Sequence, residues 1–130
     1  MSVALDSWAV IEWLRGREPA MTAINGALNA PEPPVISWIN LAELHYRWIR
    51  DHGHARATET TAALEDSLRT QLPTRETVLV AAELEADHPM ALGDCFAVAT
   101  AAKLGLELWT GDPEIIDRRS ALPCAVRDLR

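Results

Sequence analysis

The sequence predicts a single α/β domain in which a central parallel sheet of about four short strands is flanked by helices. Three observations lead to this prediction. The chain has 130 residues, the usual size of one compact domain. Its residues are 48% hydrophobic and 24% charged, which is typical of a globular protein that buries a core. Short apolar runs also alternate with segments of helical periodicity, and this alternation favours a parallel sheet layered by helices.

The first part of the chain predicts one strand and two helices. Residues 3–5 form a short apolar strand. Asp6-Ser7 then precedes apolar residues at three- and four-residue spacings, which predict a helix that ends at Gly16. Pro19 can start a second helix, which we expect to run to about Ala27.

A turn, a strand and two helices are expected in the middle of the chain. The proline-rich segment 30–34 excludes a helix and leads into residues 35–37, which form a buried strand. From 38 to 51 the apolar residues lie on one face of a helix, and Gly53 ends it. Another helix is expected from about 55 to 68.

The C-terminal half again alternates helices with strands. After the break at Pro73, residues 76–87 predict a helix. Residues 95–102 are mostly small and predict a helix that can lie very close to a sheet. The remaining expected elements are a strand at 106–110, a turn at 111–113, a short helix at 114–118 and a last strand at about 124–127.

Charge and cysteine content narrow the function classes. The formal charge of −7 at first argues against a polyanionic partner. Cys95 and Cys124 are too few for a disulfide framework, and they lack the close spacing of a zinc site. We find neither a membrane-spanning apolar run nor a secretory signal in the sequence, and therefore expect a cytoplasmic protein without membrane contact.

Four acidic residues stand at positions that have ordinary structural explanations. Asp6 follows the first strand, and Asp94 and Asp112 each precede a helix. Helix capping alone would therefore explain all three residues. Glu43 lies within a helix, four residues before Arg47, where the two could form an exposed ion pair. Each explanation is sufficient when the residue is considered alone.

Considered together, the same acids point to a metal centre. The ligand site of an open α/β sheet lies beyond the carboxyl ends of its strands, where Asp6 and Asp112 both stand. Asp94 and Glu43 lie on helices that can reach the same crevice. Because clustered carboxylates repel one another, they need a compensating cation, and oxygen ligands favour Mg²⁺ or Mn²⁺ over zinc. Such an ion beside a phosphodiester activates water, which predicts a hydrolase.

Four short motifs stand in an order that is specific only as a set. They are Ala4–Val10, Asn40–Glu43, Leu92–Asp94 with the alanine-rich helix after it, and Trp109–Pro113. In this order and spacing they resemble the PIN-domain ribonucleases, and among these the VapC-like toxins of bacterial toxin–antitoxin pairs. The resemblance covers nearly the whole chain and implies that residues 1–130 form one PIN domain.

The resemblance also implies an activity and its residues. We expect a Mg²⁺- or Mn²⁺-dependent endoribonuclease that cleaves structured RNA, such as tRNA or rRNA, and serves as the toxin of a type II pair. Its partners would be a cognate antitoxin and a second copy of the chain. The acidic positions of the family carry over onto Asp6, Glu43, Asp94 and Asp112 as catalytic and metal-binding residues, and its hydroxyl position onto catalytic Thr110. Two bound ions would change the charge from −7 to about −3, which weakens the objection to an RNA partner.

Some positions depart from the family pattern or extend it. Some relatives carry a further acid after the last motif, where this chain has Glu114 and Asp117. We place neither in the core set, because a helix N-terminus attracts acids through its dipole. Cys95 stands where alanine is frequent, and Gly111 stands where asparagine or arginine is frequent. Neither change removes a ligand, but both bear on the choice of RNA.

Two alternative hypotheses belong to other function classes. A catalytically silent PIN-like module would bind a partner or RNA without cleaving it, but the presence of four mutually repelling acids argues against this. A phosphoacceptor receiver domain also gathers acids on a parallel sheet. Such a domain needs paired acids near the first strand and a late lysine, whereas Asp6 stands alone and Lys103 follows no strand.

Basic and aromatic residues outside the acidic set allow more than one interpretation. Five tryptophans could stack on bases, but most stand at positions typical of a core or an interface. Trp13 and Leu14 mark an apolar groove that could receive an antitoxin. Several basic residues surround one interhelical turn and could form either a phosphate-binding patch or a solvated helical face: Arg47, Arg50, His52, His54 and Arg56.

Overall fold

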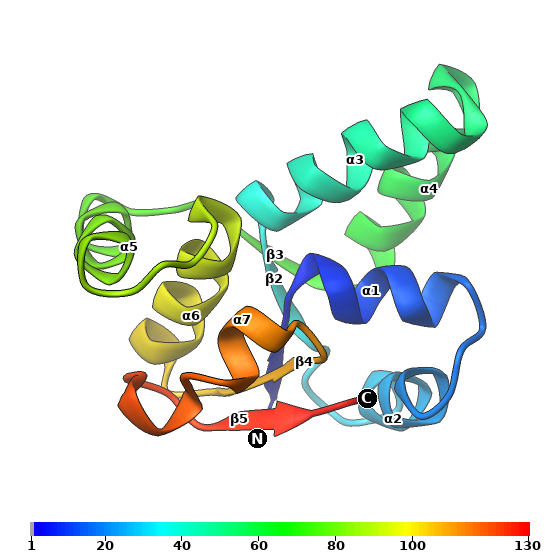
Figure 1. Ribbon diagram of the computed structural model, residues 1–130. Helices are drawn as coiled ribbons and strands as arrows, with labels where there is room; N and C mark the ends of the chain where they lie inside the picture. The colour runs from blue at the N-terminus through cyan, green and yellow to red at the C-terminus, as the bar shows by residue number, and fades with distance from the viewer. Residues whose placement is uncertain (1) are drawn as a thin grey trace.

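Five parallel strands form one sheet in the order β3-β2-β1-β4-β5 (Figure 1). The structure is a computed structural model, and it describes residues 2–130. The central strand β1 pairs with β2 on one side and with β4 on the other. The strands are β1 Val3–Leu5, β2 Val35–Ser37, β3 Arg69–Gln71, β4 Glu107–Thr110 and β5 Val126–Asp128.

Helices fill every connection between consecutive strands. Two helices join β1 to β2, two join β2 to β3, two join β3 to β4, and a short helix with a 3₁₀ turn joins β4 to β5. They are α1 Ser7–Leu14, α2 Ala20–Leu28, α3 Trp38–His52, α4 His54–Ser67, α5 Arg75–Asp87, α6 Leu92–Leu104, α7 Pro113–Ile116 and the 3₁₀ helix Arg119–Ala121.

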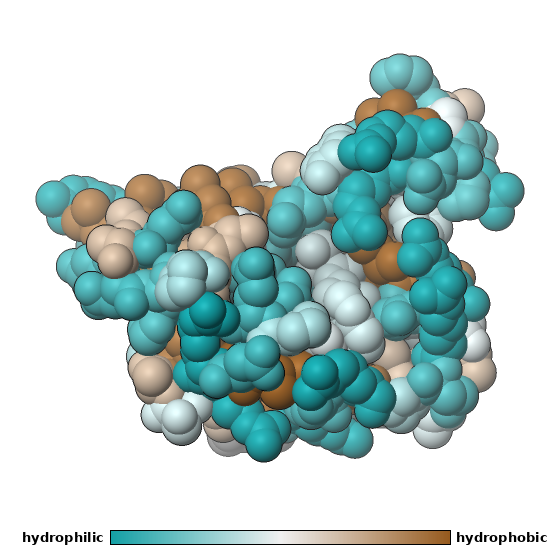
Figure 2. Space-filling view, in the orientation of Figure 1, coloured by the Kyte–Doolittle hydropathy of each residue, from teal (hydrophilic) through white to brown (hydrophobic). Residues whose placement is uncertain are grey.

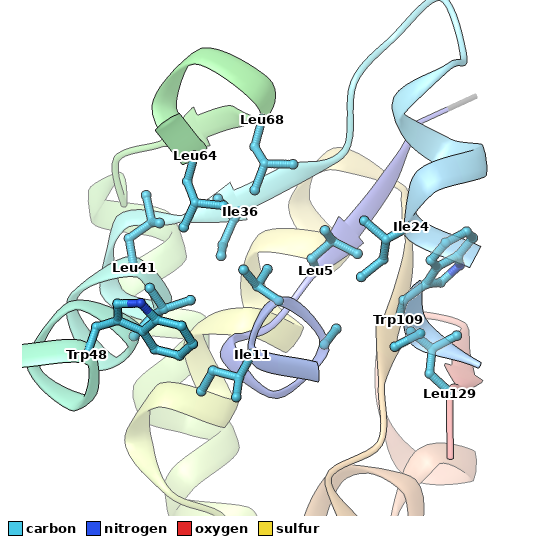
Figure 3. Close-up of a cluster of buried hydrophobic side chains, with 14 of the residues drawn as sticks. Leu5, Ile11, Ile24, Ile36, Leu41, Trp48, Leu64, Leu68, Trp109 and Leu129 are labelled. Atoms are coloured by element: carbon cyan, nitrogen blue, oxygen red, sulfur yellow. The ribbon is translucent and has the colours of Figure 1, made fainter. Parts of the chain in front are cut away.

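The sheet lies between two helical layers because its strands alternate their side chains. Leu5 and Trp109 belong to a core shared with α1, α2, α3 and α4, part of which Figure 3 shows. Ala4 and Leu108 point to the other face, into a core shared with α5 and α6. Figure 1 shows α1 and α2 on one side of the sheet and α5 and α6 on the other. The predicted α/β class is therefore confirmed.

The strand order places a topological switch point between β1 and β4. From β1 the chain moves outward through β2 to β3, and it then crosses back to add β4 and β5 on the other side of β1. Ligands of open α/β sheets bind at such a point, beyond the carboxyl ends of the two strands that flank it. The ends of β1 and β4 are therefore where this fold offers a site.

The sheet has five strands, whereas the sequence predicts about four. The missed strand is β3, whose residues Arg69, Thr70 and Gln71 are exposed or half-buried at a sheet edge. Because an edge strand buries little surface, it carries no apolar run that would reveal it. The last strand, β5, also lies slightly later than expected, at Val126–Asp128.

The helix of small residues packs as predicted but begins earlier. Helix α6 starts at Leu92 rather than Cys95, and residues 93–101 are all buried. It contacts α5, α3 and the strands β1, β2 and β4. Alanine and glycine allow this approach from several sides, since they project little beyond the helix backbone.

Two further features concern the environment of the chain. Cys95 and Cys124 are both free thiols. Within residues 2–130, no helix combines the length and the apolar character needed to cross a membrane.

Candidate metal centre

The ends of β1 and β4 bring the first and the last acidic motif together. In the sheet, Leu5 of β1 lies opposite Trp109 of β4. The next residues along each strand, Asp6 and Thr110, therefore emerge side by side, and the Thr110 hydroxyl donates a hydrogen bond to Asp6 Oδ2. The same hydroxyl oxygen accepts a hydrogen bond from the Asp112 backbone N–H at 2.9 Å. Thr110 thus fixes the position of Asp6 relative to the turn that carries Asp112.

Asp6 is both a helix cap and a member of the acidic site. Its Oδ1 accepts a hydrogen bond of 2.8 Å from the Ala9 N–H, which caps α1. Its side chain is nearly completely buried. The cap uses Oδ1 and leaves Oδ2 to the Thr110 hydroxyl, so capping does not prevent Asp6 from facing the turn that carries Asp112.

Asp94 does not cap its helix, contrary to the structural explanation considered for it. Helix α6 begins at Leu92, its N-cap is Ala91, and no side chain caps it. Asp94 is therefore in the first turn rather than before the helix. Its carboxylate turns to the other acids instead: one oxygen each of Asp94, Asp112 and Glu114 lie within 4.8 Å of one another.

Glu114 is brought into the site although the core set from the sequence omits it. Its Oε2 accepts a hydrogen bond of 3.1 Å from the Ala91 N–H, which ties α7 to the start of α6. Asp117 is not part of this cluster. The sequence signal for Glu114 is its position two residues after Asp112, on the first turn of α7, but the helix dipole alone accounts for an acid there.

Glu43 approaches the site from α3. Its Oε1 accepts hydrogen bonds from Asn40 Nδ2 at 2.9 Å and from Ser7 Oγ at 3.4 Å. Its carboxylate also lies so close to Gly93 that a Cβ atom on that residue would collide with it. Glu43 forms no ion pair with Arg47 along residues 2–130, so the exposed-pair alternative is wrong.

Asn40 is a residue of the site that the sequence interpretation missed. Its Nδ2 donates to Gly93 O at 3.0 Å as well as to Glu43, and so it joins α3 to the start of α6. Its Oδ1 is buried and has no hydrogen-bond partner among the described residues. The signal was its place three residues before Glu43, on the same face of the helix.

Burial and mutual repulsion shift the acids toward their protonated forms. Burial raises the pKa of Asp6 to about 7, the hydrogen bonds from Thr110 and Ala9 oppose this rise, and the charges of Asp112 and Glu43 add to it. The pKa of Asp94 is also raised, first by burial and then by the charges of Asp112 and Asp6. Removing a proton from either group therefore places an uncompensated charge in the interior.

The donor set fits a hard divalent cation. Asp94, Asp112 and Glu114 cluster here, and Asp6 and Glu43 lie close enough for their charges to act on Asp94. In the part of the chain that the structure describes, none of these five acids pairs with lysine, arginine or histidine. The ligand atoms on offer are all carboxylate oxygens, which Mg²⁺ and Mn²⁺ prefer. The buried Asn40 Oδ1 adds an acceptor that a metal-bound water could satisfy.

Comparisons with known proteins identify the family and the fold. The PIN domain family model matches residues 3–121. No curated protein sequence matches the chain. Among solved structures, the chain is similar to VapBC2 from Rickettsia felis bound to a promoter DNA fragment, with a TM-score of 0.80, 13% identity and 100% of both chains covered. DNA-bound VapBC from Salmonella typhimurium gives a TM-score of 0.79 at 17% identity, covering 100% of this chain and 99% of the other.

A third similar structure is described by what it cleaves. It is VapC20 from Mycobacterium tuberculosis, described as a sarcin–ricin loop cleaving toxin, with a TM-score of 0.72 and 21% identity. The match covers 89% of this chain and 94% of that one. At these identities the three structures establish a shared fold, and the family model establishes the family.

Proposed function

Because this chain belongs to the PIN-domain family, we propose that it is a Mg²⁺- or Mn²⁺-dependent endoribonuclease that acts as the toxin of a type II toxin–antitoxin pair. One observation carries the proposal. Carboxylate oxygens of Asp94, Asp112 and Glu114 lie within 4.8 Å of one another at the switch point of the sheet, without a basic partner among residues 2–130. This arrangement suits a site that binds cations rather than one that only stabilises the fold.

The proposed ligands are Asp6, Glu43, Asp94 and Asp112, with Glu114 as an addition from the geometry. These carboxylates would hold a Mg²⁺ or Mn²⁺ ion, which would supply Lewis acidity to activate a water molecule and to offset negative charge on the phosphodiester.

The other residues position these ligands. Thr110 and the Ala9 N–H each hold one oxygen of Asp6. Asn40 and Ser7 hold Glu43, and the Ala91 N–H holds Glu114. Fixed carboxylates need little rearrangement when a cation arrives, which favours binding in one geometry.

Structured RNA, either tRNA or rRNA, is the proposed substrate class. Support comes from the similar structure described as a sarcin–ricin loop cleaving toxin. An antitoxin is the proposed regulator, because another similar structure, VapBC-5 from Mycobacterium tuberculosis, is described as a member of the VapBC family of toxin–antitoxin systems. The groove beside Trp13 and Leu14 stays a prediction for its docking. In the structure both side chains are half-buried, and Trp13 Nε1 donates a hydrogen bond to Asn25 on α2 at 2.9 Å.

A homodimer is proposed on the basis of an apolar surface on α5 and the start of α6. Its exposed side chains are Leu72 before α5, Val78 and Leu79 on α5, and Leu92 at the start of α6. Figure 2 shows hydrophobic atoms gathered over this side of the molecule. Leu79→Glu should convert a dimer into a monomer without unfolding it, as measured by light scattering and circular dichroism. An unchanged mass would remove this surface from the interface.

The nuclease activity is tested with the purified chain, freed of any antitoxin, on purified tRNA and rRNA. The wild type should cleave the RNA in Mg²⁺ or Mn²⁺, and cleavage should stop when EDTA removes the ion. Asp94→Asn should lose at least a hundredfold in rate, because it removes a charged ligand. Asp66→Asn is the matched control, since Asp66 is exposed on α4 far along the chain from every site motif.

Two results would contradict the proposal. Undiminished cleavage by Asp94→Asn would show that the acidic cluster is not the site. Retained RNA binding without cleavage in either ion would favour the catalytically silent PIN-like module.

A further inference from the structure

A pocket rich in arginine adjoins the acidic centre. It has a volume of about 180 Å³ and lies between α1 and α3, which contact each other. Three arginines and a tryptophan contribute to its wall. The lining residues are Trp8, Ile11, Glu12, Arg15, Arg17 and Arg47.

Trp8 is the wall that this pocket shares with the acidic centre. It stands two residues after Asp6, on the first turn of α1. Its six-membered ring lies so close to Gly111 that a Cβ atom there would collide with it. Gly111 immediately precedes Asp112, so the ring borders the acidic turn on one side and the pocket on the other. The missing side chain at position 111 is therefore what leaves room for Trp8.

Arg47 forms a second connection between the two sites. It follows Glu43 by four residues on α3, so the two side chains project from the same helix face about 6 Å apart along the axis. Arg15 lies directly after the end of α1 and also lines the pocket. Arg15 thus follows the helix that carries Trp8, and Arg47 follows Glu43 on α3. Both arginines lie farther from the acids than Trp8 and Glu43 do.

The pocket keeps positive charge available. Arg47 is exposed and forms no ion pair within residues 2–130. Arg15 reaches Asp51 only at 3.7 Å, and Arg17 pairs with Glu12 at 3.2 Å. Exposed pairs of this kind are weak and exchange readily for another anion. The lining holds three guanidinium groups and the Glu12 carboxylate, and Asp51 adds a second carboxylate beside it, so the pocket keeps an excess of one positive charge in a chain whose net charge is −7.

We propose that this pocket binds the nucleotide next to the scissile phosphate of the RNA, with Arg15 and Arg47 on a phosphate and the ring of Trp8 stacked on a base. This inference rests on the proposed nuclease function. Guanidinium groups match the geometry of phosphate oxygens, and a tryptophan face accepts any base. The combination of a stacking surface with cations suits a nucleotide better than an acidic peptide, which offers charge but no ring.

RNA binding is measured in an Asp94→Asn background with Mg²⁺ present, so that the RNA stays intact. The probe is a fluorescein-labelled single-stranded RNA of mixed sequence. Arg47→Gln and Arg15→Gln should each weaken binding roughly tenfold, as expected for the loss of a charge-assisted hydrogen bond. Each should also reduce the slope of log affinity against log salt by about 0.7. Arg75→Gln, an exposed arginine on α5, is the matched control and should change neither value.

Stacking by Trp8 has its own test. Trp8→Phe keeps an aromatic face and should retain most of the affinity. Trp8→Leu keeps an apolar side chain without the face, and it should lose roughly fivefold to a hundredfold. In the cleaving protein, Arg47→Gln should raise KM and leave kcat nearly unchanged, because the pocket holds RNA without touching the reacting atoms.

The outcomes separate this inference from the proposed function. Unchanged RNA affinity, salt slope and KM in both arginine variants would overturn the inference, even if metal-dependent cleavage is found. Loss of RNA affinity in these variants would support it, even if the wild type never cleaves. Binding of an oligoglutamate peptide of equal charge is measured in the same variants. If the arginine variants lose affinity for this peptide but not for RNA, the pocket belongs to a protein partner and the inference is overturned.

Discussion

At the scale of single residues, burial of the Asp6 carboxylate favours its protonated form, whereas a cation site needs the charged form. The side chain is nearly inaccessible, and the pKa of its carboxyl is raised from 3.8 to about 7, chiefly by burial. A group whose pKa is higher in the folded state stabilises the fold while it is protonated. Without a divalent ion, the free energy of unfolding should therefore fall as pH rises.

The first prediction gives the window of this pH effect. Between about pH 4 and pH 7 the folded chain holds a proton on Asp6 that the unfolded chain releases, so the contribution of Asp6 to stability is lost across this range and levels off above it. The upper limit of the loss is roughly 4 kcal/mol. Urea unfolding at a series of pH values in EDTA measures it, and Asp6→Asn should make the profile shallower, with the remaining slope coming from Asp94, whose pKa is also raised. A profile equally steep in Asp6→Asn would contradict this origin.

The second prediction concerns the close approach of Glu43 to Gly93. Gly93→Ala places a methyl group where the Glu43 carboxylate lies, so the carboxylate must move away from Asn40. We expect the cleavage rate to fall by roughly tenfold to a hundredfold, since small displacements of ligands are costly. Gly26→Ala on α2 is the control, because beyond its chain neighbours and its own helix backbone no atom lies within 4 Å of the new methyl group.

The control has an expected direction of its own. Ala is a better helix former than Gly, so Gly26→Ala should raise the free energy of unfolding by about 0.5–1 kcal/mol and leave cleavage unchanged. Thermal unfolding and cleavage rates together measure both variants. A fully active Gly93→Ala protein would show that the position of Glu43 is not required.

At the scale of secondary structure elements, burial decided which parts were predictable. The strands β1 and β2 and most helices follow from apolar runs and periodic patterns, and they lie within a few residues of their expected bounds. The polar edge strand β3 carried no such pattern. The start of α6 was misplaced because Gly93 and Asp94 look like a turn before a helix, whereas they form its first turn.

The site was predictable to the extent that it follows from the ends of strands. Asp6 and Asp112 stand next to strand ends, so their convergence follows from a parallel sheet. Asn40 and Glu114 could not be placed in the same way. Their roles depend on how α3 and α7 meet the start of α6, which is a matter of tertiary packing.

The third prediction tests the packing of α6. Ala101 is completely buried on this helix, so Ala101→Leu should overpack the core and lower the free energy of unfolding by about 1–3 kcal/mol. Ala86→Leu adds the same side chain at an exposed position of α5 and should change stability by less than about 0.5 kcal/mol. Urea titrations give both values. Equal effects would mean that α6 has free space around it.

At the scale of the whole molecule, charge is unevenly distributed. The net charge of −7 includes five acids gathered at one site, and three of the arginines line the adjoining pocket. A polyanion therefore meets different local fields on different parts of the surface. The net charge of the whole chain is therefore a poor guide to whether it binds a polyanion.

The fourth prediction is that divalent ions stabilise the whole fold. An ion that binds only the folded chain should raise the free energy of unfolding by about 2.7 kcal/mol at a hundred times its Kd. Asp94→Asn should remove most of this gain, yet be more stable than the wild type in EDTA, because asparagine is neutral without the proton uptake on folding that the raised pKa of Asp94 requires. Thermal unfolding with and without Mg²⁺ measures both effects, with Asp66→Asn as the control. A wild type indifferent to Mg²⁺ and Mn²⁺ would contradict the metal centre.

The pairing of β1 with β4 also has a consequence for the timing of activity during synthesis. The hydrogen bond between Thr110 and Asp6 joins residues 104 positions apart in the sequence. A growing polypeptide therefore has no complete acidic centre until Glu114 has emerged from the ribosome. The ribosome that makes this protein is exposed to an assembled acidic centre only after every residue from Asp6 to Glu114 has been made.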